Sequence, residues 1–365
     1  MEQKRIIAIH LPQFHPFKEN DEWWGKGFTE WTNVAKARPM FRGHYQPHIP
    51  ADLGFYDLRL EESRIAQANL AKEYGIYGFC YYHYWFNGHQ LMERPLEEIL
   101  SSGKPDFPFM ICWANENWTR AWDGSEKQIL IKQDYSEQDD RAHINFLCNH
   151  YFKDKRYIRI NNKPVFCIYR SQLFPDLEKS IKVMRDEAKK CGEELYICRF
   201  ESFHSIGKEY LKSGFDAAVE FQPWIEYSKK EIYLSPKLLL NALWIKFFRQ
   251  PLFPTLRDYE EYYKNEIRTL VDYKRFPCVT PMWDNASRRK GNSFSALINS
   301  TPQKYKLWLL EVLRRFEPYS KEENFVFINA WNEWAEGNHL EPDIKWGREY
   351  LEKTKEALAE VGNNS

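Results

Sequence analysis

The chain has 365 residues, no formal net charge and 17% aromatic residues, including 14 Trp and 22 Tyr. The zero net charge gives no electrostatic basis for binding nucleic acid, and no apolar run is long enough to predict a membrane-spanning helix. The seven cysteines are odd in number, and several lie in apolar, strand-like runs, which is typical of reduced thiols rather than of disulfides. With no signal peptide visible, the sequence predicts a cytoplasmic protein, and its aromatic residues favour contact with carbohydrate.

Short apolar runs alternate with helical patterns along the chain. The predicted strands are residues 5–11, 77–83, 109–114, 165–169, 195–200, 217–221, 278–282 and 325–330. The predicted helices are residues 58–74, 95–100, 137–152, 177–191, 208–212, 259–273, 303–316 and 347–361. This alternation predicts a parallel sheet with crossover helices.

Eight strand and helix units predict one closed (β/α)8 barrel of the TIM type, formed as a single domain by residues 1–365. A doubly wound open sheet is the alternative. The barrel is favoured because unusual polar and aromatic residues follow strands one, two, three, seven and eight. In a barrel those strand ends share one mouth, so a single site can use all of them.

Two segments fall outside the alternation. The first loop, about residues 16–56, has little periodicity, and structureless loops of this length are usually functional. The second is an insertion after strand six, residues 223–256. Within it, residues 238–248 are mostly apolar with cations spaced beside them, which predicts an amphipathic helix. Residues 236–249 either lie on a membrane surface, as a peripheral contact, or pack over the barrel, and the packed arrangement is favoured.

The last predicted strand, residues 325–330, is followed at once by indoles, an amide and two acids. These residues are Trp331, Asn332, Glu333, Trp334 and Glu336. Buried acids are costly unless they are paired or used in chemistry. Aromatic rings pack on the apolar face of a pyranose, and carboxyl groups exchange protons with its oxygens. The cluster therefore predicts a sugar site, although two acids that cap a following helix would give part of the same pattern.

Strand three ends in a similar stretch, and Glu116 in it has two readings of equal weight. It contacts a sugar, or it forms an ion pair with Arg120, four positions further on. Polar and aromatic residues at the strand ends and in the first loop form the predicted substrate-binding set: Gln13, His15, Trp31, Tyr82, His83, Trp85, Trp113, Asn115, Glu116, Trp118, Trp283, Asp284, Asn332 and Trp334. Of the residues predicted here, Gln13, Tyr82, His83, Asn115, Glu116, Asp284 and Glu333 are expected to face one mouth of the barrel.

Several common site patterns are missing from the sequence. No histidine or cysteine shows the spacing of a metal site, and no glycine-rich phosphate loop occurs. The Asp-x-Asp pair of many metal-dependent sugar-nucleotide transferases is also absent. The sequence therefore predicts no metal and no cofactor.

Five stretches of the chain resemble the bacterial WbsX family. They are residues 11–16 (LPQFHP), 21–33 (DEWWGKGFTEWTN), 81–86 (YYHYWF), 113–119 (WANENWT) and 329–337 (NAWNEWAEG). Proteins of this family are usually described as glycosyltransferases and are found with lipopolysaccharide and capsule biosynthesis. The family is in turn similar to family-99 glycoside hydrolases, which are endo-α-mannosidases and mannanases on a (β/α)8 barrel. This second resemblance rests on residues 332–337 and on the barrel order.

The family-99 resemblance implies a metal-independent, retaining enzyme for an α-linked, mannose-like glycan. It implies that Glu333 deprotonates the sugar 2-hydroxyl, so that a 1,2-anhydro sugar forms, and that Glu336 protonates the leaving oxygen and later activates water. The spacing agrees, since two acids three positions apart on one loop do not easily reach opposite faces of C1, as ordinary retaining pairs do. We therefore expect Glu333 to be ionised and Glu336 to have a raised pKa.

Two other functions remain open. One is a sugar-nucleotide-dependent glycosyltransferase in O-antigen or capsule assembly, for which the sequence shows no diphosphate site. The other is a carbohydrate-binding protein that has lost catalysis. The intact pair of acids, Glu333 and Glu336, is evidence against this function. The expected partner is an oligosaccharide or polysaccharide, and a lipid-linked glycan would suit membrane contact by residues 236–249.

Overall fold

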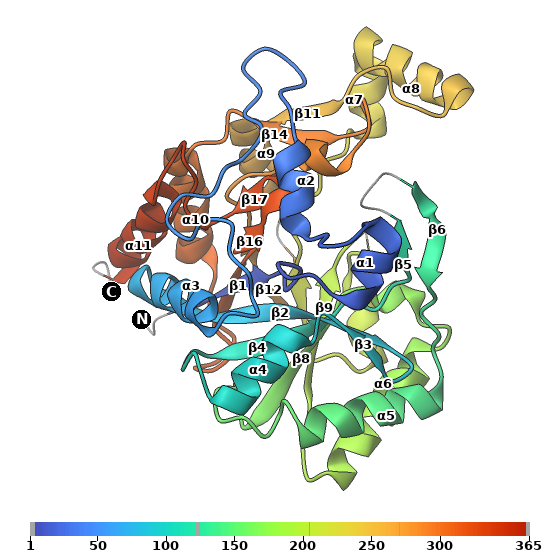
Figure 1. Ribbon diagram of the computed structural model, residues 1–365, viewed down its shortest axis with the longest axis vertical. Coiled ribbons are helices and arrows are strands. Elements are labelled where there is room, and N and C mark those ends of the chain that lie inside the picture. The colour runs from blue at the N-terminus through green and yellow to red at the C-terminus, as the bar shows by residue number, and fades with distance from the viewer. Residues whose placement is uncertain (1–3, 121–124, 204, 270, 363–365) are drawn as a thin grey trace.

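The computed structural model describes residues 4–120, 125–203, 205–269 and 271–362, and a parallel barrel lies at its centre (Figure 1). The barrel strands are β1 (Arg5–His10), β2 (Ile76–Phe86), β4 (Phe109–Trp113), β8 (Lys163–Ile168), β9 (Tyr196–Glu201), β10 (Ala217–Glu220), β12 (Arg275–Phe276), β13 (Cys278–Val279) and β15 (Phe325–Ile328). Their order is β12-β10-β9-β8-β4-β2-β1-β15-β13, and each neighbouring pair is parallel. The predicted barrel is confirmed.

The barrel nearly closes through its seventh strand, which is split in two. Strands β12 and β13 are separated only by Pro277; β12 pairs with β10 and β13 pairs with β15. A proline has no N–H to donate to a sheet, so it interrupts the strand. The Glu220 carboxylate accepts a hydrogen bond from the Cys278 N–H at 3.0 Å across the seam. The seventh strand was predicted at residues 278–282. It begins at Arg275 and ends at Val279, so it starts and ends three residues before the prediction.

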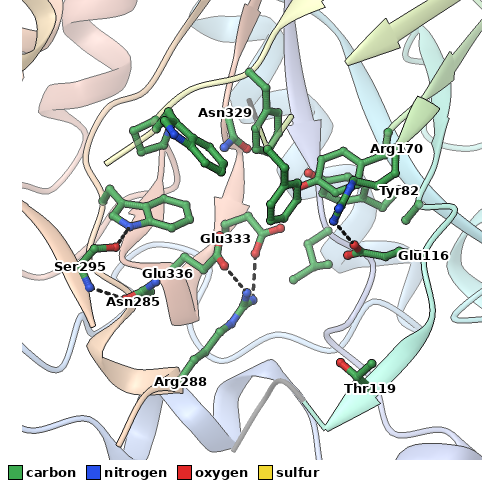
Figure 2. Close-up of a pocket in the computed structure, with 18 of the residues that line it drawn as sticks. Tyr82, Glu116, Thr119, Arg170, Asn285, Arg288, Ser295, Asn329, Glu333 and Glu336 are labelled. Carbon is green, nitrogen blue, oxygen red and sulfur yellow. Dashed lines mark hydrogen bonds and ion pairs between the residues drawn. The ribbon is translucent and has the colours of Figure 1, made fainter. Parts of the chain in front are cut away.

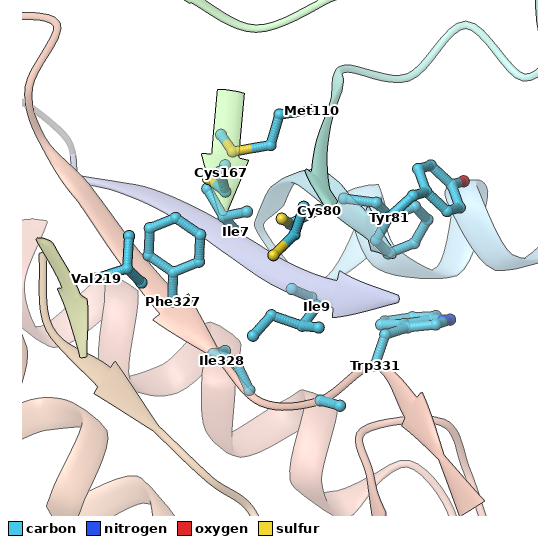
Figure 3. Close-up of a cluster of buried hydrophobic side chains, with 14 of the residues drawn as sticks. Ile7, Ile9, Cys80, Tyr81, Met110, Cys167, Val219, Phe327, Ile328 and Trp331 are labelled. Carbon is cyan, nitrogen blue, oxygen red and sulfur yellow. The ribbon is translucent and has the colours of Figure 1, made fainter. Parts of the chain in front are cut away.

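The barrel strands are buried and make the core (Figure 3). Side chains from different strands meet there, among them Ile7, Ile9, Cys80, Met110, Cys167, Val219, Phe327 and Ile328. All seven cysteines are free thiols, and all except Cys191 are buried. The expectation of reduced cysteines is thus confirmed.

Helices surround the barrel (Figure 1). They are α3 (Glu61–Glu73), α4 (Arg94–Ser102), α5 (Glu137–Asn149), α6 (Leu177–Lys190), α9 (Tyr259–Glu266), α10 (Pro302–Arg315) and α11 (Glu349–Gly362). Side-chain caps fix where three of them begin: Ser136, Asp176 and Thr301 each accept a hydrogen bond from the backbone N–H three residues on. The crossover predicted at 208–212 is a 3-10 helix, Lys208–Ser213.

The first loop is more ordered than the sequence predicted. It contains two short helices, α1 (Lys18–Trp24) and α2 (Glu30–Lys36). Seven residues make only two turns, too few for a clear helical period in the sequence. Further small strands extend the barrel ends: β3 (His89–Leu91), β5 (Trp118–Arg120), β6 (Ser125–Ile131), β7 (Arg159–Ile160), β16 (Asn332–Glu333) and β17 (Asn338–His339).

The insertion follows β10, as predicted, and forms helices α7 (Lys229–Leu234) and α8 (Pro236–Phe248) before strand β11 (Thr255–Asp258). Strand β11 pairs with β14 (Ser295–Ile298). Figure 1 shows α8 standing away from the barrel, and none of its residues is buried. A helix at 238–248 is therefore confirmed, whereas the favoured packing over the barrel is not. Its apolar side chains also lie all around the helix instead of on one face, so it is not amphipathic.

Candidate active site

A cavity of about 680 Å³ opens where the barrel strands end. Its volume lies in the range of roughly 300–1,000 Å³ that is usual for ligand pockets. Aromatic, acidic and cationic side chains line it together, among them Tyr82, Tyr84, Glu116, Trp118, Tyr169, Arg170, Trp224, Trp283, Arg288, Asn329, Glu333 and Glu336. Figure 2 shows Glu333 and Glu336 side by side in this cavity.

The two acids reach the cavity because the chain turns sharply after β15. Glu333 ends the short strand β16, and Glu336 ends the 3-10 turn Trp334–Glu336. Gly337 then adopts a φ of +53°, and a Cβ atom there would lie 2.9 Å from the backbone oxygen of Asp284. Only glycine fits that position without displacing the neighbouring loop. The glycine that ends the sequence motif thus lets the acid loop pack against the loop after β13.

One guanidinium holds both acids. Arg288 lies in the 3-10 turn Asn285–Arg288, and its Nη1 donates to Glu336 Oε1 at 2.6 Å. Its Nη2 donates to Glu333 Oε2 at 2.9 Å and to Glu30 Oε1 at 2.7 Å. Neighbouring nitrogens of one planar group therefore fix the Glu333 and Glu336 carboxylates on the same side (Figure 2).

Glu30 is a third acid of this cluster that the sequence analysis did not single out. It lies in α2, is fully buried, and also accepts a hydrogen bond from the Ala335 N–H at 2.9 Å. Burial raises its pKa, although Arg288 and the Ala335 N–H favour the charged form. Glu30 thus connects the first loop to the loop that carries both candidate catalytic acids.

Burial raises the pKa of Glu333 to about 8, and Glu336 and Glu30 add to the effect, while Arg288 opposes it. The pKa of Arg288 is itself raised, because the three acids outweigh the burial that disfavours its charge. One cation faces three clustered carboxylates, so the protonated form of Glu333 is favoured. This differs from our expectation of an ionised Glu333. The physical reason is its depth: its side chain is 8% exposed, against 23% for Glu336.

The raised pKa of Glu333 predicts a pH-dependent stability. Unfolding releases the proton that folded Glu333 still binds between about pH 4.5 and pH 8, so stability falls as pH rises through that window. The expected slope approaches about 1.4 kcal/mol per pH unit. Between about pH 5.5 and 7.5, urea denaturation should show wild type losing about 2–3 kcal/mol relative to Glu333→Gln. Glu62→Gln, an exposed change on α3, should follow wild type, and parallel curves for wild type and Glu333→Gln would contradict the assignment.

The opposite side of the cavity carries a second ion pair. Glu116 accepts a hydrogen bond from Arg170 Nη1 at 2.7 Å, and the Arg170 guanidinium lies 3.7 Å from the ring centre of Phe203. The alternative partner of Glu116, the Arg120 side chain, lies outside the described residues. Asn115 does not face the cavity; its side chain bonds the backbone N–H and C=O of Arg170 at 2.7 and 3.0 Å. It thereby positions the arginine that Glu116 binds.

The cavity brings together only part of the predicted binding set. Tyr82, Glu116, Trp118 and Trp283 line it. His83, Trp85 and Trp113 do not line it: the His83 and Trp113 side chains contact His143 of α5, and the Trp85 ring stacks on the same imidazole at 4.7 Å. Side chains alternate between the two faces of a strand, so Tyr82 inside the barrel places His83 outside.

The remaining predicted residues hold loops together behind the cavity. Asn332 bonds the backbone of Leu11 and the Tyr56 hydroxyl, Trp334 donates to Glu341, and Trp31 donates to the Tyr56 carbonyl. His15 contacts the Pro12 carbonyl, and Gln13 is fully buried. Asp284 accepts hydrogen bonds from His44 and Gln46. None of these six residues of the predicted set lines the cavity.

Sequence reasoning missed several residues that do line it. Tyr84 follows Tyr82 by two positions, so strand alternation alone could have found it. Tyr169 is the last residue of the fourth predicted strand, so its place at a strand end could have marked it. Trp224 and Arg288 lie in loops without periodicity, and no spacing in the sequence marks them.

Comparison with known proteins gives a family for most of the chain. A family model for the glycosyltransferase WbsX matches residues 6–354. Two proteins of Xanthomonas campestris pv. campestris, each described as the uncharacterized protein WxcX, are 40% identical over 356 residues. The match covers 97% of this chain but 49% of each relative, so the chain spans about half of their length.

Solved structures support the fold. A family-99 endo-α-mannosidase from Bacteroides thetaiotaomicron is similar with a TM-score of 0.61 at 13% identity, covering 100% of this chain and 99% of that one. A glycoside hydrolase-like protein is similar with a TM-score of 0.60 at 15% identity, covering 98% and 94%. Identities this low show a shared barrel and no more. The family match and the relatives go further: the chain belongs to the WbsX glycosyltransferase family.

Proposed function

We propose that this chain is a glycan-active enzyme in which Glu333 and Glu336 are the catalytic acids. Its substrate is an α-linked, mannose-like oligosaccharide or polysaccharide, cleaved or transferred with retention and without a catalytic metal. The observation that carries the proposal is the clamp of both carboxylates by Arg288 inside an aromatic cavity. Residues 1–365 act as one catalytic unit.

The shared clamp favours a neighbouring-group mechanism. An ordinary retaining pair attacks and protonates from different sides of the ring, with carboxyl groups about 5–5.5 Å apart. Here both acids bind one guanidinium, so a nucleophile supplied by the sugar suits the geometry better. Glu333 takes the 2-hydroxyl proton, O2 forms a bond to C1, and Glu336 gives its proton to the leaving oxygen. Water or an acceptor hydroxyl then opens the 1,2-anhydro ring, with Glu336 taking the proton and Glu333 returning one to O2.

The raised pKa of Glu333 has a consequence for this mechanism. A carboxylate whose conjugate acid has a pKa of about 8 is a stronger base than an ordinary glutamate, which helps it accept a proton from a hydroxyl. It must first lose its own proton, so turnover should rise with pH towards about 8.

Aromatic side chains in the walls of the cavity would bind the sugar rings of the substrate. Trp283 is fixed by a hydrogen bond from its Nε1 to Ser295 Oγ at 3.2 Å, and Tyr82 and Tyr169 pack edge to face at 5.9 Å. Rigid rings bind the apolar faces of sugars at a low entropy cost. Asn285, whose side-chain oxygen accepts from the Ser295 N–H, fixes the same wall.

The second candidate function is glycosyl transfer in lipopolysaccharide O-antigen or capsule biosynthesis, and the family description favours it. Both functions use the same pocket and differ in donor. The test incubates the protein with α-mannooligosaccharides and, separately, with sugar nucleotides plus acceptor glycans, and follows products by mass spectrometry. Cleavage or transglycosylation of an oligosaccharide that is lost in Glu333→Gln supports the first function. Consumption of a sugar nucleotide alone would overturn it in favour of the second.

We also infer that helix α8 contacts an anionic lipid surface. Its apolar side chains are largely in solvent, with Phe247 74% and Phe248 59% exposed. Residues 236–250 contain cations and no acid, which complements anionic headgroups. No helix in the described part of the chain is long and apolar enough to cross a membrane. Surface contact would bring a lipid-linked glycan within reach of the cavity. The cytoplasmic location remains a prediction.

Liposome co-sedimentation tests this inference. Wild type should sediment with vesicles containing anionic phospholipid, and the Trp244→Glu, Phe248→Glu double variant should lose most of that binding, because both rings are exposed and stack at 4.1 Å. The control is a Phe55→Glu, Leu307→Glu double variant, which changes two exposed apolar residues outside the insertion. Negligible binding by wild type would contradict lipid contact.

A further inference from the structure

A buried group of three metal-ligand side chains lies outside the cavity. His48 Nδ1 is 2.9 Å from His339 Nε2, and His339 Nε2 is 3.9 Å from Asp343 Oδ2. All three of these atoms lie within 4.8 Å of one another. The residues are only 4%, 1% and 1% exposed. Each of the three side chains has a hydrogen-bond partner, and a cation held between them would replace the contact between the two histidines.

One nitrogen of His339, Nε2, faces the group with its lone pair and accepts a hydrogen bond from His48 Nδ1 at 2.9 Å. His339 Nδ1 lies 2.8 Å from the backbone carbonyl of Glu341. A carbonyl only accepts, so Nδ1 carries the proton and Nε2 presents its lone pair to His48 and Asp343. Metal-binding histidines in proteins commonly donate their other ring N–H to a backbone carbonyl in this way. The Trp334 ring, stacked on His339 at 3.8 Å, fixes the plane of the imidazole.

Asp343 is oriented in a similar manner. Its Oδ1 accepts a hydrogen bond from the Trp346 N–H at 2.6 Å, which leaves Oδ2 directed to the group. The Tyr45 hydroxyl donates to the same Oδ2 at 3.0 Å. Outer hydrogen bonds of this kind hold the ligands of metal sites in place.

We propose that His48, His339 and Asp343 form a binding site for a divalent transition metal, with Zn²⁺ as the best match. Two imidazole nitrogens and one carboxylate oxygen suit zinc, which takes four ligands in a tetrahedron, the fourth being water here. The proton that His48 Nδ1 donates to His339 Nε2 would move to His48 Nε2 when the metal binds, so that both facing nitrogens become ligands. The histidine spacing in the sequence gave no sign of this site, because its ligands come from positions 48 and 339.

The site joins two segments that build the active cavity. His48 belongs to the first loop, which also supplies Glu30 to the acid cluster. His339 lies in β17, directly across from Asn332 of β16, the strand that carries Glu333. Backbone hydrogen bonds from Ala51 to Pro342 and from Ile344 to Ile49 already connect the segments. The metal is a structural clamp for the acid loop and has no part in the proposed proton transfers.

Metal content of the intact chain tests the site without any assay of activity. The protein is incubated with excess zinc sulfate, desalted and measured by inductively coupled plasma mass spectrometry. Wild type should retain about one zinc per chain, and His339→Gln and Asp343→Asn should each retain less than about a tenth of that. The matched control is His44→Gln, which removes another histidine of the first loop, one that contacts Asp284 instead. It should bind zinc like wild type.

A thermal melt separates lost ligands from lost folding. Zinc should raise the Tm of wild type by about 5 °C over the same protein in EDTA, since a bound ligand stabilises the folded state. The Tm of His339→Gln and of Asp343→Asn should lie near that of EDTA-treated wild type, and zinc should not change it. Less than a tenth of a zinc in wild type, or equal zinc in wild type and both variants, would overturn the proposal. Neither result depends on the glycan chemistry, so the two proposals fail separately.

Discussion

Replacing Glu333 or Glu336 with glutamine should each lower kcat by at least about 10²–10⁴ on the true glycan, because each removes a proton acceptor or donor from the transition state. Binding should persist, since the aromatic walls remain; isothermal titration with the substrate checks this. The matched control is Glu116→Gln, which changes a carboxylate that lines the same cavity but lies outside the Arg288 clamp. It should lower activity much less. Near-wild-type turnover by either Glu333→Gln or Glu336→Gln would exclude the pair, and Glu116 would become the next candidate.

Substrates with different leaving groups assign the two roles. An aryl glycoside with an acidic phenol needs no proton to leave, so it should partly restore Glu336→Gln but not Glu333→Gln. A 2-deoxy or 2-fluoro substrate should fail even with wild type, since no 2-hydroxyl remains to attack C1. Wild-type turnover should rise towards about pH 8, as ionised Glu333 becomes available. Rescue of Glu333→Gln instead would exchange the roles, making the protonated Glu333 the acid.

Removing the Arg288 cation should destabilise the fold by about 3–5 kcal/mol, because Arg288→Met leaves acids buried without their cation. Glu30 is fully buried and would keep only the hydrogen bond from the Ala335 N–H. The loss of stability should be larger at high pH. At low pH the acids left without Arg288 can bind protons, so that no uncompensated charge is buried. Urea denaturation at about pH 5 and pH 8 measures both effects. Lys290→Met removes an exposed cation two residues away and should change stability little.

A double variant tests whether the buried charge of Glu30 causes the loss of stability in Arg288→Met. Adding Glu30→Gln to Arg288→Met replaces the buried carboxylate by a neutral amide of similar shape, so part of the lost stability should return. Strictly additive losses from the two changes would show that Arg288 and Glu30 are not coupled, contrary to the 2.7 Å contact between them.

The candidate site could be predicted from the sequence only where strand ends marked it. Glu333 and Glu336 follow a buried apolar strand, and helix capping by the two acids would not explain the tryptophans beside them. Tyr82 and Glu116 were found because they lie near or just after the ends of predicted strands. His83 and Trp85 were predicted to bind substrate with Tyr82, but they do not line the cavity, because the prediction treated a whole strand end as one surface. A strand presents alternate residues to opposite faces, and in this barrel the outer face contacts α5.

The sequence by itself predicted the alternating strands and helices and the insertion after strand six, since short apolar runs such as residues 325–328 are typical of buried strands. It also located the acid pair. Only the tertiary structure decided what surrounds that pair: Arg288 from the turn after β13 and Glu30 from the first loop meet Glu333 across 45 and more residues of chain. The raised pKa of Glu333 follows from that meeting and from burial, neither of which any local pattern encodes. The same holds for His48 and His339, 291 residues apart, whose contact exists only once the first loop has folded against β17.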